Sequence, residues 1–306
     1  MKIGFGLPVS GAWATPDNIS RFATLADASG YATLWTFQRL LVPQGSAMEP
    51  VYQSVLDPVA ALAYAAAFTE RIRLGVAVIN TPYVSPGYLA KQAASLDVLS
   101  SGRLDLGLGL GWMPEEFVLT AASMQRRGAR TAEYIRVLRA LWGEQPAEFS
   151  GEFYTVPRGT VLPRPVQNGG PPILLGGTSP AALRRAGRIA DGWVTSSRTD
   201  LARISEGIDI VRQAAAAEGR EPSALRIICR GLVDWAEPST DASGHRRLLT
   251  GSKDQIREDV TWLAGQGVTE VFYDLNWDPL IGAPDANPGQ AADRAAVILD
   301  ALAPGS

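Results

Sequence analysis

Short apolar segments rich in β-branched residues alternate along the chain with longer segments whose apolar residues recur at helical spacing. This alternation is typical of repeated βα units around a parallel sheet. The pattern predicts strands at 3–7, 31–36, 72–79, 103–111, 172–175, 192–195, 225–233 and 268–275. It predicts helices at 16–29, 58–69, 86–99, 130–142, 180–189, 201–218, 253–265 and 290–302.

Eight strands and eight helices in alternation predict a (β/α)8 TIM barrel, and 306 residues suit such a barrel with insertions. A doubly wound open sheet is the competing topology, but its G-x-G-x-x-G fingerprint is absent after the first strand. Residues 147–166 break the rhythm with aromatic residues among Gly and Pro, which indicates a short hairpin or excursion inserted after the fourth βα unit. This segment is too short for a second domain, so we expect one domain over residues 1–306.

Composition and charge limit the kinds of molecule that this protein is expected to bind. The chain is 46% hydrophobic and 19% charged, which is enough apolar material for a large core. A formal net charge of −3 offers no basic surface for nucleic acid or an anionic membrane, so a small-molecule substrate is the expected partner. The N-terminal segment lacks the features of a signal peptide, and the longest helical apolar stretch, 58–68, is too short to span a bilayer. We therefore expect a cytoplasmic protein.

The chain has one cysteine and one histidine. With Cys229 alone, an intramolecular disulfide and a multi-cysteine metal site are excluded. A single His245 disfavours multi-histidine metal centres and any histidine-dependent triad that does not use it. Its neighbours Gly244 and Arg246 indicate an exposed loop. No resident metal is expected.

In barrels of this type the active site lies at the carboxyl ends of the strands. The strongest signal there follows strand 172–175, where two glycines, Gly176 and Gly177, come first. Two candidates for a helix N-cap, Thr178 and Ser179, follow them, and Pro180 stands at the first helical position. Exposed amides at such a helix start, with glycines that allow close approach, can hold a phosphate. The alternative interpretation is an ordinary βα turn.

Two further strand ends carry candidate binding residues. Strand 103–111 has glycine at 107, 109 and 111, so either a flat ring or another backbone approaches it closely, and Trp112 follows. Trp112 can stack on a ring or cover the core. Strand 72–79 ends at Asn80, which can present its amide to a ligand or cap a turn.

The loops after the first two strands contribute the remaining candidates. Trp13 follows the first strand, and Phe37, Gln38 and Arg39 follow the second. We predict that Trp13 and Phe37 contact substrate and that Gln38 and Arg39 supply an amide and a fixed positive charge to the reaction. A surface loop would also explain these residues.

Together these motifs resemble the luciferase-like monooxygenase superfamily, and more closely its branch that uses the deazaflavin coenzyme F420. The resemblance spans nearly the whole chain, at residues 3–8, 26–35, 96–104, 107–112, 176–179 and 190–193. It implies a cofactor ring against a bulge at the end of the third strand, with a non-prolyl cis peptide that falls at Ala77-Val78. It also implies that residues 176–179 hold the cofactor phosphate and that the protein forms a homodimer. By the same resemblance, the ring or substrate side is lined by Asn80, Leu110, Gly111 and Trp112.

The chain departs from that branch at two positions. Many relatives carry Asp-His or Glu-His after the second strand, with the histidine implicated in proton transfer, where this chain has Gln38-Arg39. Arginine stays protonated, so Arg39 can orient an anionic substrate, contact the cofactor or stabilise negative charge, but it cannot act as an ordinary general acid. A glutamate that some relatives have at the end of strand four is replaced by Trp112. Glu115 and Glu116 are either its substitutes or exposed loop carboxylates.

The sequence therefore predicts an F420-dependent oxidoreductase that transfers a hydride between the deazaflavin and a small organic substrate. One alternative is an FMN-dependent monooxygenase that activates oxygen. Another is a flavin- or ligand-binding protein without catalysis. A deazaflavin reacts poorly with oxygen because carbon replaces a reactive ring nitrogen, so the cofactor decides the reaction class.

Overall fold

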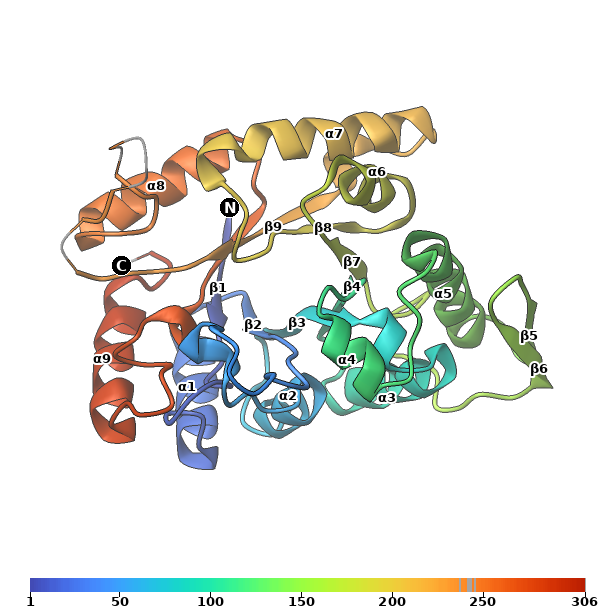
Figure 1. The fold of residues 1–306 in the computed structure, drawn as a ribbon, viewed down its shortest axis with the longest axis horizontal. Helices are drawn as coiled ribbons and strands as arrows, with labels where there is room; N and C mark the ends of the chain where they lie inside the picture. Colours follow the sequence, from blue (N-terminus) through green and yellow to red (C-terminus); the bar gives the residue numbers. More distant parts are fainter. Residues whose placement is uncertain (237, 241–243, 245, 306) are drawn as a thin grey trace.

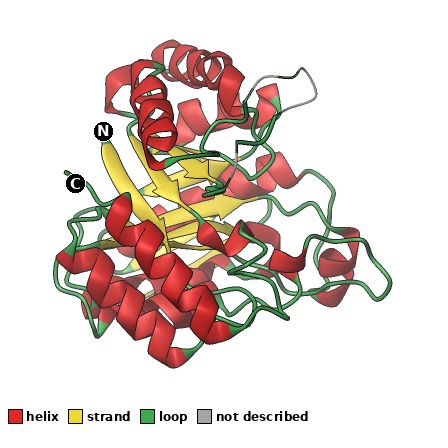
Figure 2. Cartoon of the chain, turned by 90° about the vertical axis from the view of Figure 1, so that its left-hand side faces the viewer, coloured by secondary structure: helices red, strands yellow, loops and turns green. Residues whose placement is uncertain are grey.

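The computed structural model describes residues 1–236, 238–240, 244 and 246–305. Eight parallel strands close into a barrel in the order β1-β2-β3-β4-β7-β8-β9-β10, which returns to β1. Their bounds are β1 Lys2–Gly6, β2 Thr33–Thr36, β3 Arg73–Asn80, β4 Leu104–Gly109, β7 Ile173–Gly176, β8 Gly192–Val194, β9 Arg226–Gly231 and β10 Glu270–Tyr273. Figure 2 shows the helices around these strands, which confirms the predicted (β/α)8 TIM barrel.

A helix follows each barrel strand. These helices are α1 Pro16–Ala28, α2 Pro58–Ala66, α3 Pro86–Leu99, α5 Arg127–Trp142, α6 Pro180–Ile189, α7 Ile204–Ala217, α8 Lys253–Gly265 and α9 Pro288–Ala301. Several begin with proline directly after a polar cap; Thr15, Asp57 and Ser85 each accept a hydrogen bond from the backbone amide three residues on. Single 3₁₀ turns lie at Pro50–Tyr52, Thr81–Tyr83, Leu201–Arg203, Pro222–Ala224 and Leu275–Trp277.

Two segments lie outside this alternation. The antiparallel pair β5 (Ala147–Ser150) and β6 (Thr155–Gly159) forms a hairpin that projects from the barrel beside α5, as Figure 1 shows. This hairpin confirms the insertion expected within 147–166. Helix α4 (Pro114–Leu119) was not predicted; it is a short helix in the segment interpreted as a loop after strand four. Six residues are too few to display a helical hydrophobic period.

The amino ends of the strands hold a buried charged cluster. Asp105 is bound by Arg73 at 2.6 Å and by Arg226 at 2.7 Å, and Glu270 accepts from the Trp35 indole at 2.8 Å. Burial opposes ionisation of Asp105, but the two guanidinium groups hold its pKa below the usual range. Above this cluster the indole of Trp35 stacks on Phe272, with ring centroids 5.2 Å apart. Because paired charges and packed rings fill this end, the carboxyl ends of the strands are the place for a ligand.

The one cysteine and the one histidine of the chain differ in what is known of their positions. Cys229 lies in β9 and is fully buried. His245, expected on an exposed loop, lies outside the described residues. Over the ranges that the structure describes, no helix combines the length and apolar character needed to cross a membrane.

Candidate active site

Hydrogen bonds join three of the predicted residues across the carboxyl ends of β2, β3 and β4. The backbone N–H of Asn80 donates to Gln38 Oε1 at 2.9 Å, and Asn80 Nδ2 donates to the same oxygen at 3.3 Å. Asn80 Oδ1 in turn accepts from the backbone N–H of Gly111 at 2.9 Å. Leu110, between the end of β4 and Gly111, is partly exposed. Asn80 is therefore the bridge that fixes the neighbouring strand ends relative to one another.

The end of β3 carries the bulge that the resemblance implied. The peptide bond between Ala77 and Val78 is cis, as expected, and the register between β3 and β4 shifts at this point. The side chain of Val78 lies against glycines of two other strands. A Cβ added to Gly109 would lie 2.5 Å from Val78 Cγ2, and one added to Gly176 would lie 3.2 Å from Val78 Cγ1. Gly109 is thus required by close packing of the bulge, which is one of the two readings that the sequence left open.

Arg39 lies in a nearly closed pocket at the end of β2. Its Nη1 is 3.1 Å from Glu116 Oε1, and only 6% and 2% of the two side chains are exposed. Glu116 Oε1 also accepts from the backbone N–H of Leu40 at 2.8 Å. The guanidinium lies over the ring of Tyr52 at 4.5 Å and over that of Trp112 at 5.0 Å. Paired and shielded in this way, Arg39 is held in a fixed position at the barrel mouth, with its charge balanced by Glu116.

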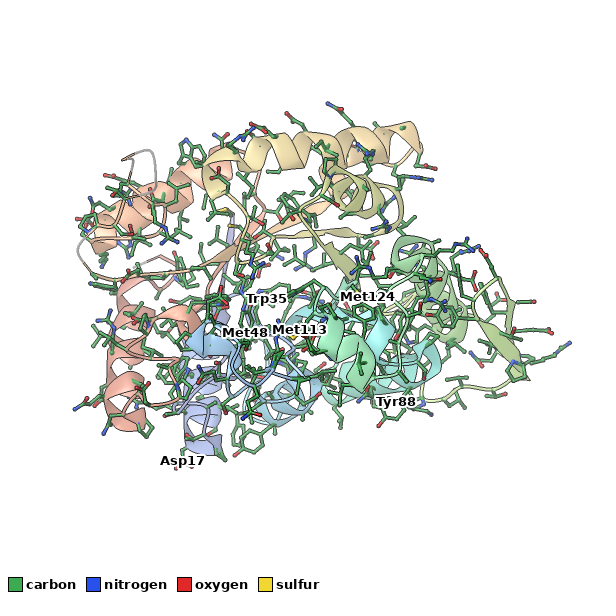
Figure 3. The ribbon with its side chains drawn as sticks, viewed as in Figure 1. Asp17, Trp35, Met48, Tyr88, Met113 and Met124 are labelled. Carbon is green, nitrogen blue, oxygen red and sulfur yellow. The ribbon has the colours of Figure 1, made fainter. Side chains whose placement is uncertain are left out.

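Helix α4 brings Glu116 to this position. The interpretation as exposed loop carboxylates is correct in the exposure of Glu115 only: both residues lie on α4, which turns Glu116 inward and its neighbour outward. Met113 directly precedes the helix and is labelled beside α4 in Figure 3. Its Sδ accepts a long hydrogen bond from Arg39 Nη1 at 3.5 Å. The partner of Arg39 was missed because the helix that positions it was missed.

Tyr83 places a hydroxyl in the same cluster. Gly111 has a φ of +68°, and a Cβ there would lie 2.5 Å from Tyr83 Oη, so only glycine fits beside this hydroxyl. The ring of Tyr83 packs edge-on against Phe117 of α4, with centroids 5.1 Å apart. Burial, followed by the nearby Glu116 carboxylate, raises the pKa of Tyr83 well above its ordinary value. Tyr83 therefore keeps its proton at neutral and moderately alkaline pH.

The glycine turn after β7 has the form expected for a phosphate-binding turn. Ser179 Oγ accepts from the backbone N–H of Ala182 at 3.3 Å, and Pro180 is the first residue of α6. The carbonyl of Gly177 accepts from the Trp193 indole at 2.9 Å, which ties the turn to β8. Thr178 and Ser179 are exposed at the start of the helix. Phosphate binding by residues 176–179 stays a prediction.

A second buried ion pair lies at the mouth and was not predicted. Arg230 Nε donates to Asp274 Oδ2 at 2.7 Å, and the side chain of Arg230 is only 7% exposed. Its guanidinium lies over the rings of Phe37 at 4.7 Å and Trp277 at 5.6 Å. Both charged residues fall at the ends of predicted strands, which is the signal that could have found them.

Two predicted substrate contacts are corrected. Trp13 is fully buried; its Nε1 donates to Asn276 Oδ1 at 3.2 Å and its ring packs edge-on against Phe22. Phe37 is also buried, with Arg230 over its ring. Neither side chain presents a surface to a substrate. Both rings instead support the residues that form the mouth.

The fold is a (β/α)8 barrel. At the carboxyl ends of its strands lie a cis-peptide bulge, a glycine turn before a helix and buried arginines. The family model described as luciferase-like monooxygenase matches residues 5–261. The chain belongs to this family.

The names of two individual relatives mention different cofactors. An uncharacterized protein of Mycobacterium tuberculosis is 30% identical over 276 residues, which cover 85% of this chain and 94% of that protein. The F420-dependent glucose-6-phosphate dehydrogenase of Kineococcus radiotolerans is 30% identical over 227 residues, 72% of this chain and 64% of the relative. The FMNH2-dependent dimethylsulfone monooxygenase of Pseudomonas putida is 30% identical over 202 residues, 65% of this chain and 53% of the relative.

Among solved structures, the monooxygenase RslO1 from Streptomyces bottropensis superposes with a TM-score of 0.78 and 25% identity. The superposition covers 99% of this chain and 98% of that one. The barrel and the short insertion therefore lie within a known architecture.

Proposed function

We propose that this protein binds coenzyme F420 and transfers a hydride between the deazaflavin and a small organic substrate. The observation that carries the proposal is the surface around Val78. Its side chain, on the cis-peptide bulge, adjoins Gly109 of β4 and Gly176 at the start of the turn before α6. A Cβ at either glycine would intrude on this surface. In the proposal, a flat ring lies on this bulge and the cofactor phosphate lies on the turn that begins at Gly176.

The residues around this surface have separate roles in the proposal. Val78 and the glycines support one face of the ring, and residues 177–179 hold the phosphate at the start of α6. Gln38 Oε1 is occupied by Asn80, so the amide NH2 of Gln38 is the group available to donate to a ligand. When bound, the deazaflavin supplies the hydride chemistry, and the protein supplies orientation and exclusion of water.

Arg39 supplies electrostatic stabilisation. Hydride transfer to or from an organic substrate changes the charge on the reacting group, and the guanidinium of a buried ion pair, held in one orientation, can stabilise developing negative charge. Glu116 holds the guanidinium in place, and Trp112 covers it. Arginine does not release its proton near neutrality. Tyr83, whose raised pKa keeps it protonated, is a weak acid that can donate a hydrogen bond.

An FMN-dependent monooxygenase is the second candidate. The relative from Pseudomonas putida, named as FMNH2-dependent, supports it, whereas the relative from Kineococcus radiotolerans supports F420. The match to the F420-dependent relative is longer, at 72% against 65% of this chain. The bulge and the glycine turn suit either ring system.

The proposed reaction is tested with reduced F420 and a panel of ketones, aldehydes and cyclic enones, without oxygen. Oxidation of F420H2 that depends on both the enzyme and a panel member, and that proceeds without oxygen, supports hydride transfer. Turnover that requires FMNH2 and oxygen would instead establish the second candidate.

A further inference from the structure

A cavity of ≈ 410 Å³ lies beside the barrel mouth, between the segments that follow β8 and β9 and helix α8. Its lining consists of residues 196–202, Arg230, Leu232, residues 246–248 and Trp262. Neither the bulge nor the glycine turn belongs to this lining. The proposed roles of the site do not account for the cavity.

The cavity is cationic. The arginines that line it are Arg198, Arg230, Arg246 and Arg247. Two of these charges are already compensated, because Arg230 is paired with Asp274 and Arg246 with Asp259. Arg198 and Arg247 are exposed and form no ion pair with any other residue in the described ranges. The acidic residue in the lining, Asp200, accepts from the backbone N–H of Ala202 at 3.1 Å. The cavity therefore has positive charge available for a ligand.

The rest of the lining combines apolar side chains with the hydroxyl groups of Ser196, Ser197 and Thr199. Leu201, Leu232, Leu248 and the indole of Trp262 contribute to the same walls. A lining of leucine, tryptophan and arginine suits a carboxylate carried on a partly apolar chain better than a fully hydrated inorganic ion. Its volume is large enough for a segment of several heavy atoms.

The cavity is connected to the candidate active site through two arginines. Arg230 lines the cavity and also lies over Phe37 at the mouth. The guanidinium of Arg198 lies 5.1 Å from the ring of Trp112, and Arg39 lies 5.0 Å from the same ring. Strand β8, which leads into the cavity lining, pairs with β7, which leads into the glycine turn. The cavity lining and the glycine turn therefore follow neighbouring strands of the barrel.

We propose that this cavity binds a carboxylate-bearing extension of the ligand, with Arg198 and Arg247 as its anion-binding residues. The inference rests on the proposed function. Two sources share this chemistry. One is the acidic tail that F420 carries beyond its phosphate and that FMN lacks. The other is a carboxylate on the organic substrate.

The test uses the full chain and three oxidised deazaflavins: F420, the same ring with its phosphate but no tail, and the riboside with neither. Dissociation constants are measured by fluorescence quenching for wild type, Arg198→Gln and Arg247→Gln. If the tail occupies the cavity, each substitution raises the dissociation constant for F420 by about tenfold, the size of one charge-assisted contact. The two shorter ligands bind as they do to wild type. Arg158→Gln, the same change on the exposed hairpin strand β6, leaves all three affinities unchanged.

A second arm separates the two sources. Binding of benzoate, a simple aromatic carboxylate, is measured on protein saturated with F420. If the arginine substitutions weaken benzoate binding and leave F420 affinity intact, the carboxylate belongs to the substrate. If neither affinity depends on Arg198 or Arg247, the cavity proposal is overturned while the proposed function stands. A wild-type protein that binds none of the three deazaflavins contradicts the proposed function, and this inference with it.

Discussion

Arg39 Nη1 and Glu116 Oε1 lie 3.1 Å apart with almost no exposure to water. The pair joins the end of β2 to α4, and Glu116 also accepts from the backbone N–H of Leu40. At the position where the resemblance leads one to expect an acid-histidine pair, this protein holds a buried ion pair instead. Arginine does not release its proton near neutrality, so Arg39 is proposed to act through electrostatics and not through proton transfer.

Replacing Glu116 with Gln is expected to lower stability and turnover together. The amide keeps an acceptor for Leu40 but leaves the guanidinium of Arg39 without its counter-charge. Breaking a buried ion pair on one side costs about 3–5 kcal/mol. Urea denaturation measures this loss. The matched control is Glu115→Gln, an exposed neighbour on the same helix, whose effect should stay within about 0.5 kcal/mol. Equal stability of the two variants would show that the pair does not hold the pocket together.

Replacing Asn80 with Ala is expected to weaken cofactor binding more than its effect on stability explains. The substitution removes the two side-chain hydrogen bonds, to Gln38 and from Gly111, keeps the backbone N–H bond to Gln38, and costs about 1–2 kcal/mol of stability. The dissociation constant for F420 should rise about tenfold, because the strand ends no longer share one geometry. Asn287→Ala removes the N-cap of α9 at a similar stability cost. A comparable loss of F420 affinity in that control would assign the effect to stability alone.

Replacing Gly109 with Ala is expected to displace the bulge. The new Cβ would lie 2.5 Å from Val78 Cγ2 and 2.6 Å from Asn80 Oδ1. Overpacking of this kind costs about 1–3 kcal/mol, and it moves the surface on which the ring is proposed to lie. Gly87→Ala on α3, where a Cβ meets nothing within 4 Å, should instead be neutral or stabilising by up to about 1 kcal/mol. Unchanged F420 binding by Gly109→Ala would remove the bulge from the proposed cofactor site.

Cys229 is expected to be unreactive in the folded protein. It is fully buried, and burial raises the pKa of its thiol to about 12. Because the folded pKa lies above the unfolded value of about 8.5, the unfolded chain loses the proton first as the pH rises. The buried thiol therefore makes its full contribution to the free energy of unfolding below about pH 8.5, and this contribution is lost as the pH rises toward the pKa of the thiol in the folded protein.

Two measurements check this expectation. Iodoacetamide should label Cys229 only at the rate at which the protein opens, and the free energy of unfolding should fall more steeply with alkaline pH in wild type than in Cys229→Ala. Rapid labelling under native conditions, or parallel pH profiles, would contradict a buried thiol.

The fold was predictable because buried parallel strands and amphipathic helices leave different periods in the sequence. The helix α4 was not, since its six residues are shorter than two helical turns. That omission extended to the site: Glu116 looked like a loop carboxylate, and Arg39 had no visible partner. Residues that act through a short element are therefore the ones that local pattern alone misses.

Other parts of the site depend on contacts between distant segments. The sequence located Asn80 and Gly111 at strand ends, but only the closed barrel shows that they are hydrogen-bonded. The pairing of Arg230 with Asp274 likewise requires β9 and β10 to be neighbours. Trp13 was misread because an aromatic residue in a loop of Gly and Ala looks exposed, whereas its indole is bound by Asn276, 263 residues away.

Binding of oxidised F420 and of oxidised FMN to the purified protein, compared by fluorescence and calorimetry, tests the deazaflavin proposal. The account predicts that F420 binds at least about tenfold more tightly than FMN, a difference of about 1.4 kcal/mol. Tighter binding of FMN would contradict the deazaflavin proposal and favour an oxygen-using monooxygenase, and binding of neither would contradict both.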